Sequence, residues 1–242
     1  MAYQAVFKRY ELKYLLSPEQ KSRILEAMAS YMQPDKYGRS SIRNIYFDTE
    51  SYQLIRHSIE KPVYKEKLRL RSYGRADKNS LLFVELKKKY QSVVYKRRIA
   101  MKEADAIDFV TKDHSRHDGS QIGNEIEYFL DFYKTLRPVV FLSYEREAYY
   151  ATDGSEFRVT FDDTILCRQE NLTLDSDADG IPILPEGKIL MEIKCGGGIP
   201  LWMTQALSRE KIYKTAFSKY GTAYQKIIFP KCPRSGTKSE VI

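Results

Sequence analysis

The sequence predicts a single α+β domain in which seven or eight antiparallel strands close into a barrel with helices packed around it. Two observations support this fold class. Six or more segments alternate apolar and charged residues with the two-residue period of a strand, and segments of helical period are inserted between them. The chain has 242 residues, 43% of them apolar, and no repeat or linker divides it. We expect one domain over residues 1–230 and a disordered tail over residues 231–242.

The first quarter of the chain is expected to form two strands and two helices. Residues 9–16 alternate and predict a strand. The next helix should begin with Ser17 as N-cap, Pro18 at its first position and Gln20 closing a capping box. Residues 41–49 predict the second strand, and residues 50–60 predict a short helix.

The rest of the chain continues the same alternation of strands and helices. Strands are expected at residues 64–73, 81–89, 92–101, 138–151, 156–168 and 188–195, with the second and third of these forming a hairpin or meander. Helices are expected at residues 103–113 and 122–136, and residues 201–227 should be mostly helical.

Charge and cysteine content narrow the classes of partner and the compartment. The net charge of +8 indicates an anionic partner, either nucleic acid, phosphorylated metabolites or an acidic membrane surface. The three cysteines are far apart and show no CxxC spacing, which argues against a disulfide framework or a zinc site and favours a reducing cytoplasm. No run of about 18 apolar residues occurs, so we expect no membrane-spanning helix.

The polar faces of the predicted strands are unusual because they carry mostly full charges, with cations in excess. These faces contain Arg9, Glu11 and Lys13; Lys65, Lys67, Arg69 and Arg71; Glu85 and Lys87; Lys96 and Arg98; Arg146; Arg158, Thr160 and Asp162; and Glu192 and Lys194. One such strand is compatible with a sheet that has a solvated face. A solvated face on every strand would normally also contain many Ser, Thr, Asn and Gln residues.

Same-face neighbours on a strand are about 7 Å apart, where two like charges repel by roughly 2–3 kcal/mol at an effective dielectric constant of about 20. Cations facing one another inside a barrel would therefore oppose folding unless they bind a polyanion. Glu11, Glu85 and Glu192 would suit a divalent metal that bridges to phosphates. An eight-stranded barrel has a suitable bore, so the pattern predicts a charged tunnel.

Several motifs resemble a known family. RYELK at residues 9–13 resembles the first strand of the triphosphate tunnel metalloenzyme (CYTH-like) superfamily. Within that superfamily the chain is most similar to the polyphosphate polymerase (VTC) domain, through IYFDT, KLRLRSYG, FVELKKK, LMEIK and FSKYGTAY. The resemblance extends from about residue 5 to residue 229. It implies a tunnel of antiparallel strands that transfers the γ-phosphate of ATP to a growing polyphosphate chain with Mn²⁺ or Mg²⁺.

The resemblance also assigns roles to residues. It implies that eight cations line the phosphate path: Lys13, Arg69, Arg71, Lys87, Lys96, Arg146, Arg158 and Lys219. We expect catalytic roles for Lys13, Arg69, Arg71, Lys87, Arg146 and Arg158, and phosphate binding by Arg9, Lys67, Lys96, Arg98, Lys194 and Lys219. Glu192 is expected to be the main metal ligand, helped by Glu85 and Glu11.

Two departures from the family pattern affect this interpretation. Arg9 stands where the triphosphatase branch has its first Glu, which removes a metal ligand and favours holding a long polyanion over hydrolysis. Ala216 stands where a basic residue is expected, and Lys214 could replace it. The chain lacks the phosphate-sensing SPX module and the membrane segment of eukaryotic relatives. We therefore expect a stand-alone cytoplasmic catalytic domain, associated with a membrane only through a partner protein that exports the product.

Three functions remain open from the sequence. The leading hypothesis is an ATP-dependent polyphosphate polymerase, whose partners are ATP and polyphosphate and not a specific nucleic acid. The second is a metal-dependent triphosphatase acting on inorganic triphosphate, thiamine triphosphate or an RNA 5′ end. The third is a non-catalytic module that binds polyphosphate or another polyanion. A binding module has no need of Glu192, so Glu192→Gln separates it from either enzyme.

Overall fold

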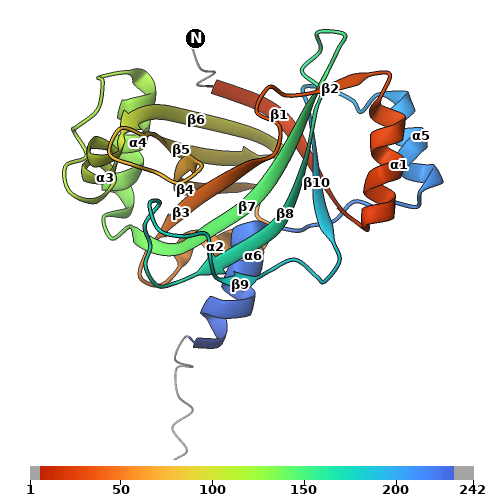
Figure 1. The fold of residues 1–242 in the computed structure, drawn as a ribbon. Helices are drawn as coiled ribbons and strands as arrows, with labels where there is room; N and C mark the ends of the chain where they lie inside the picture. Colours follow the sequence, from red (N-terminus) through yellow and green to blue (C-terminus); the bar gives the residue numbers. More distant parts are fainter. Residues whose placement is uncertain (1–5, 232–242) are drawn as a thin grey trace, which may run out of the picture.

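The computed structural model describes residues 6–231 of the chain, and its strands form the predicted closed barrel. The barrel strands are β1 (Val6–Leu16), β3 (Ser40–Asp48), β4 (Tyr64–Tyr73), β5 (Leu81–Tyr90), β6 (Val93–Lys102), β7 (Arg137–Ala151), β8 (Arg158–Arg168) and β10 (Ile189–Cys195). They follow the order β7-β3-β4-β5-β6-β1-β10-β8, and the antiparallel pairing of β7 with β8 closes the ring (Figure 1). All pairings in the ring are antiparallel.

Two short strands were not predicted. β2 (Met32–Pro34) pairs with β7, and β9 (Ile181–Pro182) pairs with β8, so both lie beside the ring. The hairpin predicted around residues 81–101 is confirmed as β5 and β6, joined by a two-residue turn at Gln91 and Ser92. Both turn residues have positive φ angles, as a type I′ hairpin turn requires.

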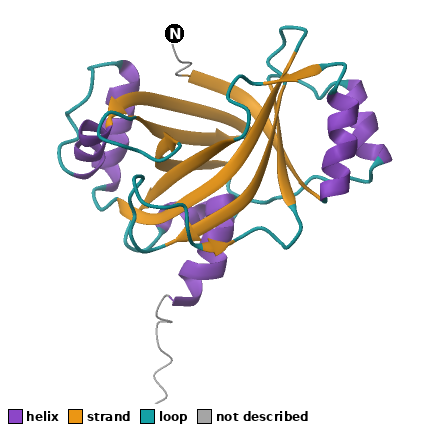
Figure 2. Ribbon diagram, viewed as in Figure 1, coloured by secondary structure: helices purple, strands orange, loops and turns teal. Residues whose placement is uncertain are grey.

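Helices surround the outside of the barrel (Figure 2). They are α1 (Pro18–Met28), α2 (Gln53–Ile59), α3 (Glu103–Thr111), α4 (Gln121–Tyr133), α5 (Leu201–Arg209) and α6 (Lys219–Ala223). The pairs α3–α4 and α1–α5 lie on opposite sides of the barrel, and α6 lies at its lower edge in the view of Figure 1. The capping box predicted for the first helix is confirmed at Ser17 and Gln20.

The apolar faces of the strands point outward and pack under these helices. Leu68, Leu70 and Leu86 belong to a core with Phe109 of α3 and Phe129 of α4. A second core joins β1, β8 and β10 to α1 and α5, and a third involves α2 and α6. The charged faces therefore point into the barrel, which is the arrangement that the sequence predicted.

The prediction of a mostly helical segment at residues 201–227 is wrong for residues 210–218. Helix α5 ends at Arg209, and the positive φ angle of Lys211, 52°, prevents the helix from continuing. The chain then pairs with β1, where Thr215 N donates to Lys13 O at 2.7 Å and Lys214 forms a bridge with Tyr14. Hydrogen bonds to β1 thus override the local helical preference of this segment. After α6 the chain continues as a π-helix at Tyr224–Ile228 and a 3₁₀ turn at Phe229–Lys231.

The tail predicted at residues 231–242 lies, apart from Lys231, outside the described residues. Within the described part of the chain, no helix is both long enough and apolar enough to cross a membrane.

Candidate functional site: a charged tunnel

A cavity of about 1860 Å³ lies inside the barrel and is lined by nearly all of the predicted site residues. All twelve predicted phosphate-contacting cations line it, namely Arg9, Lys13, Lys67, Arg69, Arg71, Lys87, Lys96, Arg98, Arg146, Arg158, Lys194 and Lys219. Of the three predicted metal ligands, Glu11 and Glu192 line the cavity and Glu85 does not. The strand alternation thus identified the interior face of the barrel.

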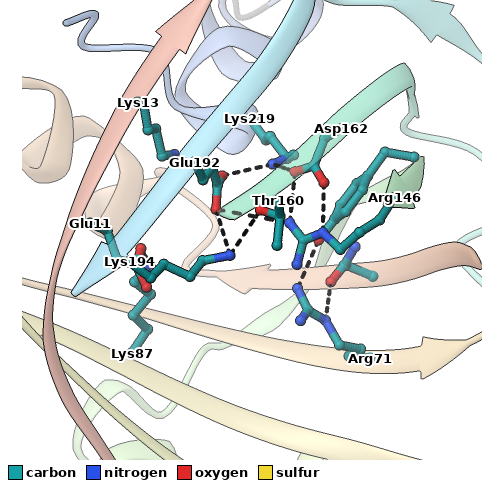
Figure 3. A network of polar contacts seen from close by, with 12 residues as sticks. Glu11, Lys13, Arg71, Lys87, Arg146, Thr160, Asp162, Glu192, Lys194 and Lys219 are labelled. Atoms are coloured by element: carbon teal, nitrogen blue, oxygen red, sulfur yellow. Dashed lines mark hydrogen bonds and ion pairs between the residues drawn. The ribbon is translucent and has the colours of Figure 1, made fainter. Parts of the chain in front are cut away.

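Glu192 lies at the centre of the densest group of charges (Figure 3). Its carboxylate is 3.0 Å from Lys219 Nζ, 3.4 Å from Lys194 Nζ and 3.5 Å from Lys13 Nζ. Burial opposes ionisation of Glu192, but these three cations outweigh it and hold the pKa well below the usual value of a glutamate. Glu192 therefore stays ionised inside the barrel.

Asp162 is a site residue that the sequence analysis placed on the charged face without assigning it a role. It is fully buried and accepts hydrogen bonds from Arg146, with Nε–Oδ1 at 2.6 Å and Nη2–Oδ2 at 2.7 Å. Lys219 Nζ also contacts Asp162 Oδ2, at 2.5 Å, so this lysine bridges Asp162 and Glu192. Asp162 lies behind the cavity lining and fixes two cations that face the cavity.

Lys219 enters the site from the C-terminal segment, not from a barrel strand. It is the first residue of α6, which Ser218 caps by accepting from Gly221 N. Tyr220 anchors the same helix, because its hydroxyl donates to the buried carboxylate of Asp48 at 2.8 Å. Burial alone would lower the pKa of Lys219, but Asp162 and Glu192 raise it above the usual lysine value. This lysine is therefore a fixed positive charge at the tunnel centre.

Glu11 forms the second carboxylate of the cavity wall. On β1 it lies opposite Lys194 of β10, one diagonal step from Glu192. Its carboxylate is 2.6 Å from Lys87 Nζ and 3.5 Å from Arg9 Nε. Burial raises the pKa of Glu11, but Lys87, Lys194 and Arg9 together outweigh this effect, and the net pKa lies well below that of a free glutamate.

Glu85 lies on β5, which is three strands away from β10 with Glu192 and two strands away from β1 with Glu11 in the eight-stranded ring. It is fully buried and is surrounded by four cations, Arg69 at 2.6 Å, Lys96 at 3.2 Å, Arg71 at 3.8 Å and Arg98 at 3.9 Å. The structure does not bring Glu85 together with Glu11 and Glu192. Its metal role stays a prediction, and its surroundings favour the role of a shared counter-ion.

Uncharged side chains complete the positioning of the cations, and the sequence analysis missed most of them. Tyr46 accepts from Arg69 Nη1 at 3.0 Å, and the Tyr144 hydroxyl accepts from Arg71 Nη2 at 2.9 Å. Thr160 accepts from Lys194 Nζ at 3.0 Å. The sequence places Tyr46 and Tyr144 at the alternate positions that face into the barrel. Because tyrosine suits either face of a sheet, this spacing alone did not identify them as site residues.

One end of the cavity is rich in lysine, and we call it the lysine mouth: Lys61, Lys65, Lys89 and Lys214. Lys65 lies opposite Lys89 in the register of β4 and β5. Burial lowers the pKa of Lys65, and the charges of Lys89 and Lys13 lower it further. Burial also lowers the pKa of Lys89, and the charge of Lys214 adds to that effect. Among residues 6–231, none of these four lysines forms an ion pair with a carboxylate. Lys214 lines the cavity as the sequence suggested, close to Ala216.

The cavity wall offers carboxylate oxygens of the kind that a divalent metal binds. No group of three or more Asp, Glu, His or Cys side chains within residues 6–231 has the spacing of a metal site. Glu192 and Glu11 nevertheless offer two ionised carboxylates on neighbouring strands of the cavity wall. Mg²⁺ is commonly bound by one or two carboxylates together with substrate phosphates, so these residues fit such a metal when phosphate is present.

Comparisons with known proteins agree with the barrel and its charged interior. A candidate adenylate cyclase from Bacillus halodurans superposes with a TM-score of 0.54 at 16% identity, covering 89% of this chain and 96% of that one. A candidate adenylyl cyclase from Hippeastrum with a dominant triphosphatase activity superposes with a TM-score of 0.55 at 16% identity, covering 90% and 95%. These likenesses show that the three proteins share a fold. The sequence also matches the VTC domain over residues 8–228. The chain therefore belongs to the VTC-domain family.

Proposed function

We propose that this protein is an ATP-dependent polyphosphate polymerase. The observation that supports the proposal best is the lysine mouth, where Lys65, Lys89 and Lys214 continue the cationic path beyond Lys13 and Glu192 without a carboxylate partner among residues 6–231. A compact triphosphate would be neutralised at the tunnel centre and would leave these lysines unused. A linear polyanion that runs out of the tunnel would contact them in succession.

The state of the cavity carboxylates favours phosphoryl transfer to phosphate over hydrolysis. A hydrolase that does not use a metal-bound hydroxide needs a protein group that accepts a proton from water, and the pKa of that group should be near the working pH. The pKa values of Glu11 and Glu192 are instead held low by Lys87, Lys219 and Lys13, against the effect of burial. A terminal phosphate oxygen of the acceptor chain is already ionised, so transfer to it needs no base.

In the proposed reaction, a terminal oxygen of the polyphosphate chain forms a bond to the γ-phosphorus of ATP. The bond between that phosphorus and the β–γ bridging oxygen breaks, and ADP leaves. Arg146, Lys219 and Arg69 hold charges against the transferred group, and their carboxylate and hydroxyl partners fix their orientation. The narrow barrel keeps donor and acceptor in line.

A divalent metal held by Glu192 and Glu11 would neutralise charge on the phosphates when it is bound. Lys194 and Lys13 flank the two carboxylates in the register of β1 and β10 and would bind the remaining phosphate oxygens.

The proposal is tested by incubating the protein with γ-labelled ATP and Mn²⁺, resolving the products on a gel and measuring free phosphate. A ladder of long labelled chains together with ADP is the expected result, and Glu192→Gln should abolish it. Free phosphate without a ladder would instead assign a triphosphatase, the activity named for the Hippeastrum protein of the same fold. If neither product forms and Glu192→Gln binds polyphosphate as tightly as the wild type, the protein is a binding module.

A further inference from the structure

A buried carboxylate lies where α2 meets α6, outside the charged tunnel. Asp48 is fully buried, and its oxygens accept from Thr49 N at 2.8 Å and from Leu54 N and Ile55 N, both at 2.9 Å. The fourth donor is the hydroxyl of Tyr220, at 2.8 Å. In the described part of the chain Asp48 forms no ion pair with a Lys, Arg or His side chain, so hydrogen bonds alone satisfy this carboxylate.

The hydroxyl of Tyr220 is tied to Asp48 by the cost of burying a carboxylate without a cation. Burial raises the pKa of Asp48, and the four hydrogen bonds oppose that rise. Three of the four donors are backbone amides, so the Tyr220 hydroxyl is the one side-chain donor. If Tyr220 moved away, a buried acceptor would be left without its partner. The position of Tyr220 is therefore restricted by this hydrogen bond as well as by the packing of its ring.

Two backbone irregularities lie beside this hydrogen bond. Tyr52, the N-cap of α2, has a φ angle of 57°, which lies in the left-handed region that a bulky residue seldom adopts. The ring of Tyr52 lies 5.5 Å from the ring of Tyr224, where the chain passes from α6 into a π-helix. Strained backbone and single π-helical turns are both concentrated at functional sites. They indicate that the contact between α2 and α6 is under a functional constraint.

The first turn of α6 is closely packed on two sides. A methyl group added at Gly221 would lie 3.1 Å from Ser218 Cβ and 4.0 Å from Ile59 Cγ1 of α2. On the barrel side, the ring of Tyr220 stacks on the ring of Tyr46 of β3, with centres 4.8 Å apart. This turn is therefore enclosed between α2 and the barrel.

Three consecutive residues at the start of α6 contact three different strands through their side chains. Ser218 accepts from Lys67 Nζ of β4 at 3.2 Å, and Lys219 Nζ lies 3.0 Å from the carboxylate of Glu192 of β10. Tyr220 donates to the last residue of β3. A lysine side chain is flexible, so its ammonium group keeps one place only when the backbone that carries it is held. The hydroxyl of Tyr220 holds that backbone one residue away from Lys219.

We propose that Asp48 and Tyr220 are positioning residues that hold the ammonium group of Lys219 at the centre of the tunnel. Asp48 does not line the cavity, and the hydroxyl of Tyr220 is engaged by Asp48. This hydrogen bond therefore acts on a ligand through Lys219 and not by contact. The inference rests on the proposed function in one respect, because it takes Lys219 as a cation that contacts phosphate.

The test is a double-mutant cycle on the binding of inorganic tripolyphosphate without metal, measured by calorimetric titration. Tyr220→Phe removes the hydroxyl and keeps the ring that stacks on Tyr46. In the wild type it should weaken binding by about tenfold, which is within the range of couplings inside one hydrogen-bond network. In a Lys219→Met background the same change should weaken binding less than about twofold, because the residue through which the hydroxyl acts is absent. Equal losses in the two backgrounds, or no loss in the wild type, would overturn the inference.

Tyr133→Phe is the matched control. Tyr133 also donates its hydroxyl to a carboxylate, that of Glu66 at 3.1 Å, but it lies on α4 and does not line the cavity. Its variant should bind tripolyphosphate as tightly as the wild type. A loss in Tyr133→Phe equal to that in Tyr220→Phe would show that removing a buried hydroxyl acts through general stability, and would overturn the inference.

A second cycle examines the carboxylate. Asp48→Asn should reproduce the loss seen in Tyr220→Phe, and combining the two changes should add less than about a further twofold. A full second loss in the combined variant would show that the two residues act separately and would overturn the inference. Urea denaturation shows whether each variant is folded in the titration, and Lys219→Gln replaces Lys219→Met if the methionine variant does not fold.

The titrations need no turnover, so they separate this inference from the proposed function. A labelled ladder from the wild type together with an additive cycle would overturn the inference and retain the polymerase. Absence of a ladder together with a non-additive cycle would overturn the polymerase and retain the positioning of Lys219. Failure of the wild type to bind tripolyphosphate would overturn both.

Discussion

Asp162 holds Arg146 by two parallel hydrogen bonds, of 2.6 and 2.7 Å, and the Asp162 side chain is completely buried. The same carboxylate contacts Lys219, so one buried negative charge fixes two of the cations proposed to hold the transferred phosphate. Burial raises the pKa of Asp162, but Arg146 and Lys219 outweigh it and keep the group ionised. Asp162 thereby links the stability of the barrel to the geometry of its centre.

The first prediction is that Asp162→Asn destabilises the protein strongly. Removing one partner of a buried ion pair leaves uncompensated charge, and we expect the free energy of unfolding to fall by about 3–5 kcal/mol. Urea denaturation measures this loss. The neighbouring Asp163 provides a control, because it pairs with Arg39, whose side chain is 47% exposed. Asp163→Asn should cost only about 0–1 kcal/mol. Equal losses in the two variants would contradict the role assigned to Asp162.

The second prediction separates Glu85 from Glu192. If Glu85 is a counter-ion for Arg69, Arg71, Lys96 and Arg98, Glu85→Gln should leave Mn²⁺ affinity unchanged, because the carboxylate does not face the cavity. Losing even an outer-shell partner costs a metal site about 10–100-fold in affinity, so Glu192→Gln should weaken Mn²⁺ binding at least that much. Electron paramagnetic resonance of free Mn²⁺, with and without a non-hydrolysable ATP analogue, gives both affinities.

Glu85→Gln should also lower the free energy of unfolding by about 3–5 kcal/mol, since four cations would lose their shared partner. If that variant does not fold, Glu85→Asp retains the charge and allows the same metal titration. A loss of Mn²⁺ affinity in either Glu85 variant that matches the loss in Glu192→Gln would restore Glu85 to the metal site.

These two residues show what the sequence could and could not determine. Alternation placed Glu85, Glu192 and Asp162 on the inner face correctly, because the strand period decides which face a residue occupies. It could not show which residues meet across the barrel, because that depends on strand order and register. For this reason Glu85 and Glu192 were grouped as ligands, although three strand steps separate β5 from β10 and Glu85 pairs with four cations of its own.

Burial depth was equally inaccessible to the sequence. Asp162 and Asp163 are adjacent and chemically identical, yet one is fully buried and the other pairs with an exposed arginine. The non-helical segment at residues 210–218 has the same origin, since its hydrogen bonds go to β1, which is about 200 residues earlier in the chain. Periodicity within a segment predicted the strands and helices. Contacts between distant segments decided how far Glu85 lies from Glu192, how deeply Asp162 is buried and where residues 210–218 leave the helix.

The third prediction concerns pH. Burial lowers the pKa of Lys96 to about 7 despite Glu85, and burial together with neighbouring cations lowers the pKa of Lys67 and Lys194 well below the usual lysine value. A bound polyanion favours the charged form of each lysine, so binding takes up protons. Tripolyphosphate affinity should therefore fall as the pH rises from 7 to 9, by up to about tenfold per pH unit for each proton taken up.

Calorimetric titration in two buffers with different enthalpies of ionisation measures the proton uptake directly. Lys96→Met is the informative variant, because it should bind tripolyphosphate more weakly at pH 7 and show a smaller dependence on pH. An affinity that stays constant between pH 7 and pH 9, without proton uptake, would show that these lysines are already charged in the free protein.

The fourth prediction concerns the salt dependence of polyphosphate binding at the lysine mouth. Each cation that contacts a phosphate chain releases counter-ions, so the logarithm of the affinity falls with the logarithm of the salt concentration by about 0.7 per contact for a single-stranded polyanion. Lys65→Ala/Lys89→Ala removes two such contacts and should reduce the slope for long polyphosphate by about 1.4. The slope for tripolyphosphate should not change, because a short chain bound at Glu192 and Lys219 does not reach these residues. Lys78→Ala/Lys188→Ala removes the same charge outside the cavity and should leave both slopes unaltered. An equal reduction for the long and the short chain would mean that the lysines act through the general field of the protein and not by contact with an emerging polymer.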